Sequence, residues 1–141
     1  MTSRDLIEPY ASLAAPGGIR LYGSGDALRG LAGLVSQDSD AEAVLATPPP
    51  EVVEVLALRA VRILPTDDGP IELRANDDVV EVSGGAEARR QLAETFENLA
   101  CTPYESSAVP KHVDLEYFPG DSFLSENSMW MTVYLLPALS V

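Results

Sequence analysis

Cysteine and histidine are nearly absent from this sequence, and their scarcity excludes several kinds of site. Cys101 is the only cysteine, so the chain forms no internal disulfide and no multi-cysteine metal site. His112 is the only histidine, so one position alone offers an imidazole as base or ligand. Nucleophilic catalysis needs a nucleophile beside an oriented base, and no such arrangement is recognisable. We therefore expect a non-enzymatic protein without a cofactor.

Basic residues and long apolar runs are also scarce. Lys and Arg total 9 against 22 Asp and Glu, which gives a net charge of −13. This charge repels phosphates and anionic lipids, so we expect no nucleic acid and no membrane as partner, and a basic protein instead. An acidic surface can also serve solubility alone, and charge does not separate the two explanations. No run of 18 apolar residues and no secretory signal is present, so we expect a cytoplasmic protein.

The apolar pattern predicts one α+β domain over residues 1–141, with two helices covering one face of a mainly antiparallel sheet. Residues 37–50 lose this periodicity and end in Pro48, Pro49 and Pro50, so they are predicted to form a loop. The stretch 52–64 changes phase partway and fits one long strand or two short ones. One predicted helix starts after Gly25, and the other covers about residues 87–100. The other predicted strands are 19–22, 71–74, 79–82, 112–118 and 129–136.

Two segments of the chain repeat the same order of features. Residues 19–32 (IRLYGSGDALRGLA) and 80–93 (VEVSGGAEARRQLA) both show a strand, a glycine turn, an acid and a helix. They predict a duplicated β-α-β-β unit, 18–75 and 78–136, with chance similarity of short segments as the alternative. The glycine turns resemble phosphate-binding loops, but the third glycine of that motif is absent and Asp26 would repel phosphate. Helix capping by Ser24 or Asp26 is the preferred interpretation.

The stretch HVDLEYFPGD, residues 112–121, carries the candidate functional residues. Alternation along a strand places His112, Asp114 and Glu116 on one face and the apolar residues between them on the other. Three ligands in a line on one strand converge poorly on an ion, so a metal site is disfavoured. A solvated face and a partner-binding face remain. The simplest interpretation of three aromatic residues is that they are sheet and core residues: Phe118, Trp130 and Tyr134. The alternative is a single exposed aromatic that anchors a partner, and the sequence does not separate the two.

Residues 78–136 resemble the immunity protein 32 family of bacterial polymorphic toxin systems. The resemblance depends on the strand VVEVSG, the helix after it, the stretch HVDLEYFPG, and the L-x-x-x-S step within FLSENSMWMTV, from Leu124 to Ser128. It implies a small cytoplasmic protein that binds and neutralises a cognate toxin delivered between cells.

Charge and resemblance together predict that an acidic surface binds a basic toxin domain. The candidate partner-binding residues are Asp114, Glu116, Asp121 and Glu126. The alternative is a small-molecule-binding or regulatory domain with a pocket between helices and sheet. A metal-dependent enzyme centred on His112 is a third hypothesis. Open sheet edges also leave homo-oligomers as an option.

Overall fold

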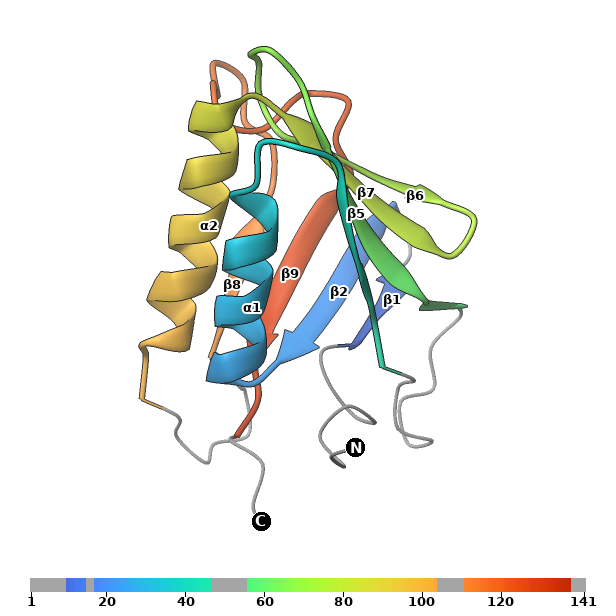
Figure 1. The fold of residues 1–141 in the computed structure, drawn as a ribbon, viewed down its shortest axis with the longest axis vertical. Coiled ribbons are helices and arrows are strands. Elements are labelled where there is room, and N and C mark those ends of the chain that lie inside the picture. Colours follow the sequence, from blue (N-terminus) through green and yellow to red (C-terminus); the bar gives the residue numbers. More distant parts are fainter. Residues whose placement is uncertain (1–9, 15–16, 47–55, 104–110, 138–141) are drawn as a thin grey trace.

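Two helices and two β-sheets make up the computed structural model, which describes residues 10–14, 17–46, 56–103 and 111–137 (Figure 1). The helices are α1 (Gly25–Val35) and α2 (Ala86–Ala100). The five-stranded sheet has the order β4 (Leu56–Leu58), β1 (Tyr10–Ala14), β2 (Gly18–Gly23), β9 (Trp130–Leu135), β8 (His112–Leu115). The four-stranded sheet has the order β3 (Ala41–Val44), β5 (Ala60–Pro65), β7 (Val79–Gly84), β6 (Glu72–Asn76).

The strands form two sheets where the sequence analysis expected one, while the α+β class is confirmed. Each sheet is mixed, because one parallel pair lies inside it: β2 with β9, and β5 with β7. All other neighbouring strands are antiparallel. The stretch 52–64 contains two short strands, and they join different sheets, since β4 pairs with β1 and β5 pairs with β3 and β7.

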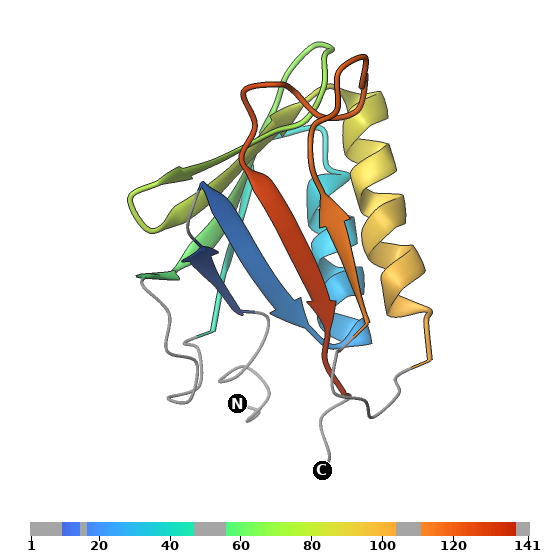
Figure 2. The same ribbon diagram turned by 180° about the vertical axis from the view of Figure 1, so that it is seen from behind.

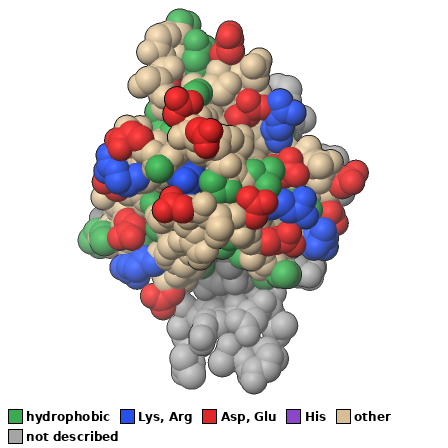
Figure 3. Space-filling model, turned by 45° about the horizontal axis from the view of Figure 1, so that its top comes forward, with side chains coloured by type: hydrophobic (Ala, Val, Ile, Leu, Met, Phe, Trp, Pro, Cys, Tyr) green, Lys and Arg blue, Asp and Glu red, His purple; other side chains and the backbone are tan. Residues whose placement is uncertain are grey.

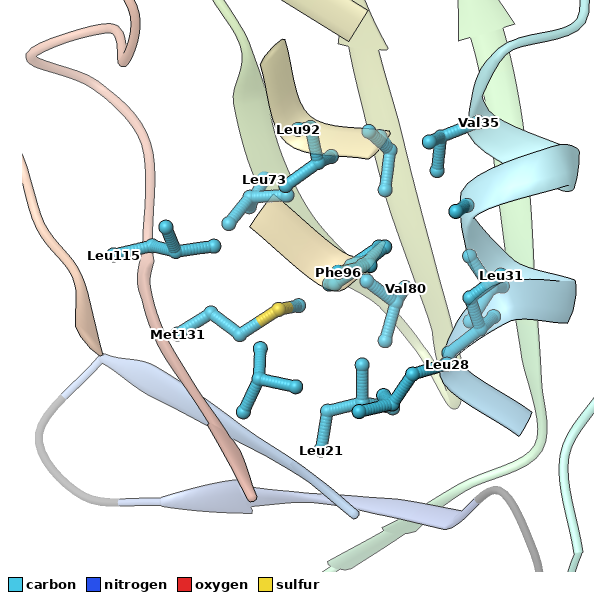
Figure 4. Close-up of a cluster of buried hydrophobic side chains, with 14 of the residues drawn as sticks. Leu21, Leu28, Leu31, Val35, Leu73, Val80, Leu92, Phe96, Leu115 and Met131 are labelled. Atoms are coloured by element: carbon cyan, nitrogen blue, oxygen red, sulfur yellow. The ribbon is translucent and has the colours of Figure 1, made fainter. Parts of the chain in front are cut away.

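One hydrophobic core joins both helices to both sheets (Figure 4). Apolar residues at three- and four-residue steps give each helix a buried stripe, as their periodicity predicts. Ser24 caps α1, because its Oγ accepts a hydrogen bond from the Ala27 N–H at 3.3 Å. The core side chains labelled in Figure 4 come from seven elements, both helices and five strands: Leu21, Leu28, Leu31, Val35, Leu73, Val80, Leu92, Phe96, Leu115 and Met131.

Arg89, in the first turn of α2, connects the elements around it. Its side chain is only 3% exposed, and its guanidinium donates to the carbonyl oxygens of Val35 (3.2 Å), Gln37 and Gly84 (3.0 Å). Asp38 adds a carboxylate contact at 3.3 Å. These bonds satisfy carbonyls at the end of α1, which has no basic residue in its own last turn. Since the start of α2 meets the end of α1, the helices are antiparallel (Figure 1).

The order of elements repeats along the chain. The series β1-β2-α1-β3-β5 is followed by β6-β7-α2-β8-β9, with the same antiparallel pairings within each series. The parallel pairs join one series to the other. Each series starts one strand earlier than the predicted β-α-β-β unit. Two predictions stay untested: the chain arose by duplication, and it forms one domain over residues 1–141.

Three boundaries differ from the predictions. A strand, β3, lies within the stretch 37–50 that was predicted to be a loop, and β1 was not predicted at all. The strand predicted at 112–118 ends at Leu115, where the register with β9 stops. Pro48 to Pro50, the reason for expecting a loop, lie outside the described residues.

Gly85 allows the loop 66–70 to pack against the start of α2. Its N–H donates to the Gly69 carbonyl at 3.1 Å, and a Cβ on Gly85 would lie 2.5 Å from the Asp68 Cα. The glycine turn before α2 therefore packs against the loop 66–70 of the same chain. We expect Gly85→Ala to lower the free energy of unfolding by about 1–3 kcal/mol, because the backbone must move. Chemical denaturation measures this.

Gly30→Ala is the matched control for that substitution. Gly30 lies in α1, with open space where a Cβ would stand. Alanine there raises the free energy of unfolding by about 0.5–1 kcal/mol through helix propensity. Equal effects of the two substitutions would contradict the packing explanation.

Replacing Arg89 tests whether its hydrogen bonds hold the two helices. We expect Arg89→Met to lower the free energy of unfolding by about 3 kcal/mol, since three carbonyls lose a charged donor. The neighbouring Arg90→Met is the control, because Arg90 contacts only exposed Glu87 and Glu94. Its denaturation midpoint should stay near that of the unchanged protein. A midpoint for Arg89→Met equal to that of Arg90→Met would contradict the prediction.

Candidate functional site

β8 forms one edge of the five-stranded sheet, and the candidate residue Asp114 lies in it (Figure 2). Asp114 is exposed and accepts a hydrogen bond from Thr132 Oγ1 across the strand pair, at 2.7 Å. Leu115 points the other way and is 7% exposed in the core. The alternation expected from the sequence therefore holds along β8. Glu116 follows the strand and is exposed.

A tight turn follows at residues 118–121. The Asp121 N–H donates to the Phe118 carbonyl at 2.8 Å, and Gly120 has φ +89°. Proline before a glycine with positive φ is typical of a type II turn. The carboxylate of Asp121, which is half-buried, then accepts from the Phe123 N–H at 2.8 Å. Asp121 is thus held in place by the turn.

Phe118 was interpreted as a sheet or core residue, and this was wrong. Its side chain is 64% exposed, because β8 has ended and the turn directs the chain away from the sheet. A large exposed aromatic residue is typical of partner-binding surfaces. Its exposure follows from where the strand ends, which the alternating pattern of residues 112–118 did not reveal. Trp130 and Tyr134 do lie in β9, as expected.

Three of the four candidate carboxylates surround one open hollow of about 460 Å³. It is lined by Asp114, Leu115, Glu116, Phe118, Pro119, Gly120, Asp121 and Phe123. A second hollow of about 210 Å³ shares Asp114, Leu115 and Glu116 and continues towards Trp130 and Thr132 on β9. The floor is thus partly apolar, and carboxylates lie around it.

The fourth candidate, Glu126, is exposed but does not line either hollow. It lies in the loop that follows, which is fixed to the other sheet. The Ser125 N–H donates to the Ile71 carbonyl at 2.8 Å, and the Leu73 N–H donates to Ser128 Oγ at 2.9 Å. Leu124 is 1% exposed in the core. The L-x-x-x-S step therefore anchors this loop beside β6.

The carboxylates around the hollow differ from most other acids in their partners. In the described part of the chain, each ion pair to arginine uses an acid elsewhere: Asp26, Asp38, Glu42, Glu72, Asp78, Glu81, Glu87 and Glu94. The helix side accordingly shows acidic and basic side chains near one another (Figure 3). There the Arg90 guanidinium lowers the pKa of Glu87 by hydrogen bonding and charge. Among the described residues, Asp114, Glu116 and Asp121 have no such arginine.

His112 lies near one of these acids. Its Nε2 lies 4.0 Å from Asp114 Oδ2, and its ring centroid lies 5.5 Å from that of Tyr134. Within residues 10–14, 17–46, 56–103 and 111–137, no three His, Cys, Asp or Glu side chains are grouped to hold a metal ion.

The cavity that the described residues form between the helices and the two sheets is too small for a small molecule. The cavity between the helices and the two sheets measures about 10 Å³. Small-molecule pockets usually measure about 300–1,000 Å³. The alternative hypothesis of a ligand pocket between helices and sheet therefore lacks the space it requires at this place.

Adding a transition metal should leave the melting temperature unchanged, because His112 and Asp114 supply only two ligands. Differential scanning fluorimetry with Zn²⁺, Mn²⁺ or Fe²⁺ measures this. The variant His112→Asn is the control for any nonspecific effect of the ion. A rise in melting temperature with a metal ion that disappears in His112→Asn would contradict the expectation.

The comparison with protein families gives a match in the part of the chain that contains β8 and the hollow. No helix within the described residues is both long and apolar enough to cross a membrane. No curated protein and no solved structure gives a significant match. A family model does match, from the start of β7 into β9, and so includes β8 and the hollow beside it. Over residues 79–133, the second half of the chain, the sequence matches the family described as Immunity protein 32.

Proposed function

We propose that this protein is a non-enzymatic inhibitor that binds a cationic toxin domain at the hollow beside β8. The family match suggests an immunity function. One observation supports this site: Asp114, Glu116 and Asp121 line one open hollow and have no arginine partner in the described part of the chain. Carboxylates that no described arginine neutralises, beside an exposed phenylalanine, favour binding of lysine or arginine together with apolar side chains.

The net charge of −13 supports the same proposal at long range. A cationic surface approaching this protein experiences attraction before any contact is made. Such steering accelerates association by about 10- to 10³-fold at low salt and weakens as salt screens the charges. The carboxylates at the hollow then determine where the partner stays.

The proposed activity is stoichiometric binding, and this chain catalyses no reaction in it. We place the protein in the cytoplasm, where a toxin delivered into the cell would meet it. We also expect a gene for a secreted toxin beside the gene for this protein. A gene neighbourhood without any toxin would count against the proposal.

Neutralising the hollow tests the proposal with the toxin domain encoded by that neighbouring gene. The set Asp114→Asn, Glu116→Gln and Asp121→Asn removes three charges and keeps the acceptor that holds the turn. We expect association to slow by about tenfold or more and to depend less on salt, because these carboxylates would contact the partner. Stopped-flow association rates between 50 and 500 mM salt measure this.

A second set removes the same charge at exposed acids away from the hollow. The set Asp40→Asn, Asp67→Asn and Glu97→Gln changes exposed acids that do not line either hollow and have no ion pair in the described part of the chain. We expect this control set to slow association about twofold or less. Equal effects of both sets would show that net charge acts without a docking site at the hollow.

A further inference from the structure

The outer edge of β8 has backbone groups available for another strand. Leu135 N–H donates to the Lys111 carbonyl, which makes these residues a hydrogen-bonded pair of the ladder. Since such pairs alternate, Val113 and Leu115 also direct their N–H and C=O groups to β9. Asp114 lies between them, so its N–H and C=O point to the outer edge, where no described strand pairs.

The edge strand β6 of the other sheet, in contrast, is partly covered by another segment of the chain. There the chain around residues 123–129 covers the start of the strand. Ile71 N–H donates to the Phe123 carbonyl at 2.7 Å, and Met129 N–H donates to the Leu73 carbonyl at 2.9 Å. One edge is thus closed by the loop that leaves β8, while the described residues place no strand against β8 itself.

The charges at the β8 edge decide what can pair there. A second copy of β8 would bring Asp114 and Glu116 near identical carboxylates, which opposes pairing between copies. A segment with lysine or arginine would place cations beside Asp114, Glu116 and Asp121 instead. Its apolar side chains could contact Phe118, which is 64% exposed.

We propose that an extended cationic segment of the partner adds to the five-stranded sheet as a strand along β8. This rests on the proposed function and specifies how the partner is held. The main-chain N–H and C=O of Asp114 form hydrogen bonds to the added strand, and alternate side chains of that strand enter the hollow. Backbone pairing supplies affinity, and the carboxylates select a basic segment.

Proline at position 114 separates backbone pairing from side-chain attraction. Asp114→Ala removes the carboxylate and keeps the N–H, whereas Asp114→Pro removes both. The lost N–H is not part of the ladder with β9, and proline is tolerated at such outward-facing edge positions. With the inactive toxin domain encoded by the neighbouring gene as probe, we expect Asp114→Pro to raise the Kd about tenfold or more above that of Asp114→Ala. Isothermal titration measures both, after thermal melts show that both variants fold.

Hydrogen–deuterium exchange of the unchanged protein gives an independent test that does not depend on folding of the proline variant. The Val113 and Leu115 amides should exchange slowly with or without the toxin domain. The Asp114 amide should exchange fast in the free protein and slowly in the complex.

The outcomes separate the two proposals. Strand addition is overturned if Asp114→Ala and Asp114→Pro weaken binding equally, or if the Asp114 amide gains no protection in the complex. Either result leaves the acidic docking surface standing. A toxin domain that does not bind, or that binds equally well when all three carboxylates are neutralised, overturns the proposed function and the strand addition with it.

Discussion

The buried guanidinium of Arg89 is the interaction on which the arrangement of this protein depends. A helix ends with carbonyl groups that lack partners, and α1 ends against α2 instead of in solvent. Arg89 supplies the missing donors for Val35 and Gln37, and its third backbone contact, with Gly84, fixes the end of β7. One side chain therefore sets the spacing of α1, α2 and the four-stranded sheet. Figure 4 shows the core that these elements share with the five-stranded sheet.

The surface near β8 depends on that fixed frame. The chain from Glu116 to Met129 leaves β8 and is hydrogen-bonded to Ile71 and Leu73 at the start of β6, so the loop that lines the hollow is fixed to the other sheet. A surface prepared in this way loses little conformational entropy when a partner binds. Arginines on the helix side pair with their own acids, so the negative field is strongest where such pairing is absent.

Local pattern predicted both helices, most strands and the outward direction of Asp114, because periodicity and glycine turns are written in adjacent residues. It did not predict β3, whose pairing with β5 includes an ion pair between Glu42 and Arg62 from distant parts of the chain. It also did not predict the division into two sheets. The change in the apolar alternation within residues 52–64 allowed two short strands. Tertiary contacts decide which strand each of them pairs with, and these are not written in the local sequence. The exposure of Phe118 was missed for a related reason, since the end of β8 depends on its register with β9.

The two parallel strand pairs have a consequence for how the chain acquires its structure. β9 pairs with β2 and β7 pairs with β5, so each sheet is completed by strands from both halves. The region matched by the family model contains β7, α2, β8 and part of β9, but β2 and β5 lie before it. The four-stranded sheet can close once the chain through Gly84 is available, but the five-stranded sheet needs β9, so a ribosome must release nearly the whole polypeptide before that sheet is complete. Contacts so distant in sequence make folding slow. Under the proposed inhibitor function, only finished molecules bind the partner, so a store of them is needed in advance.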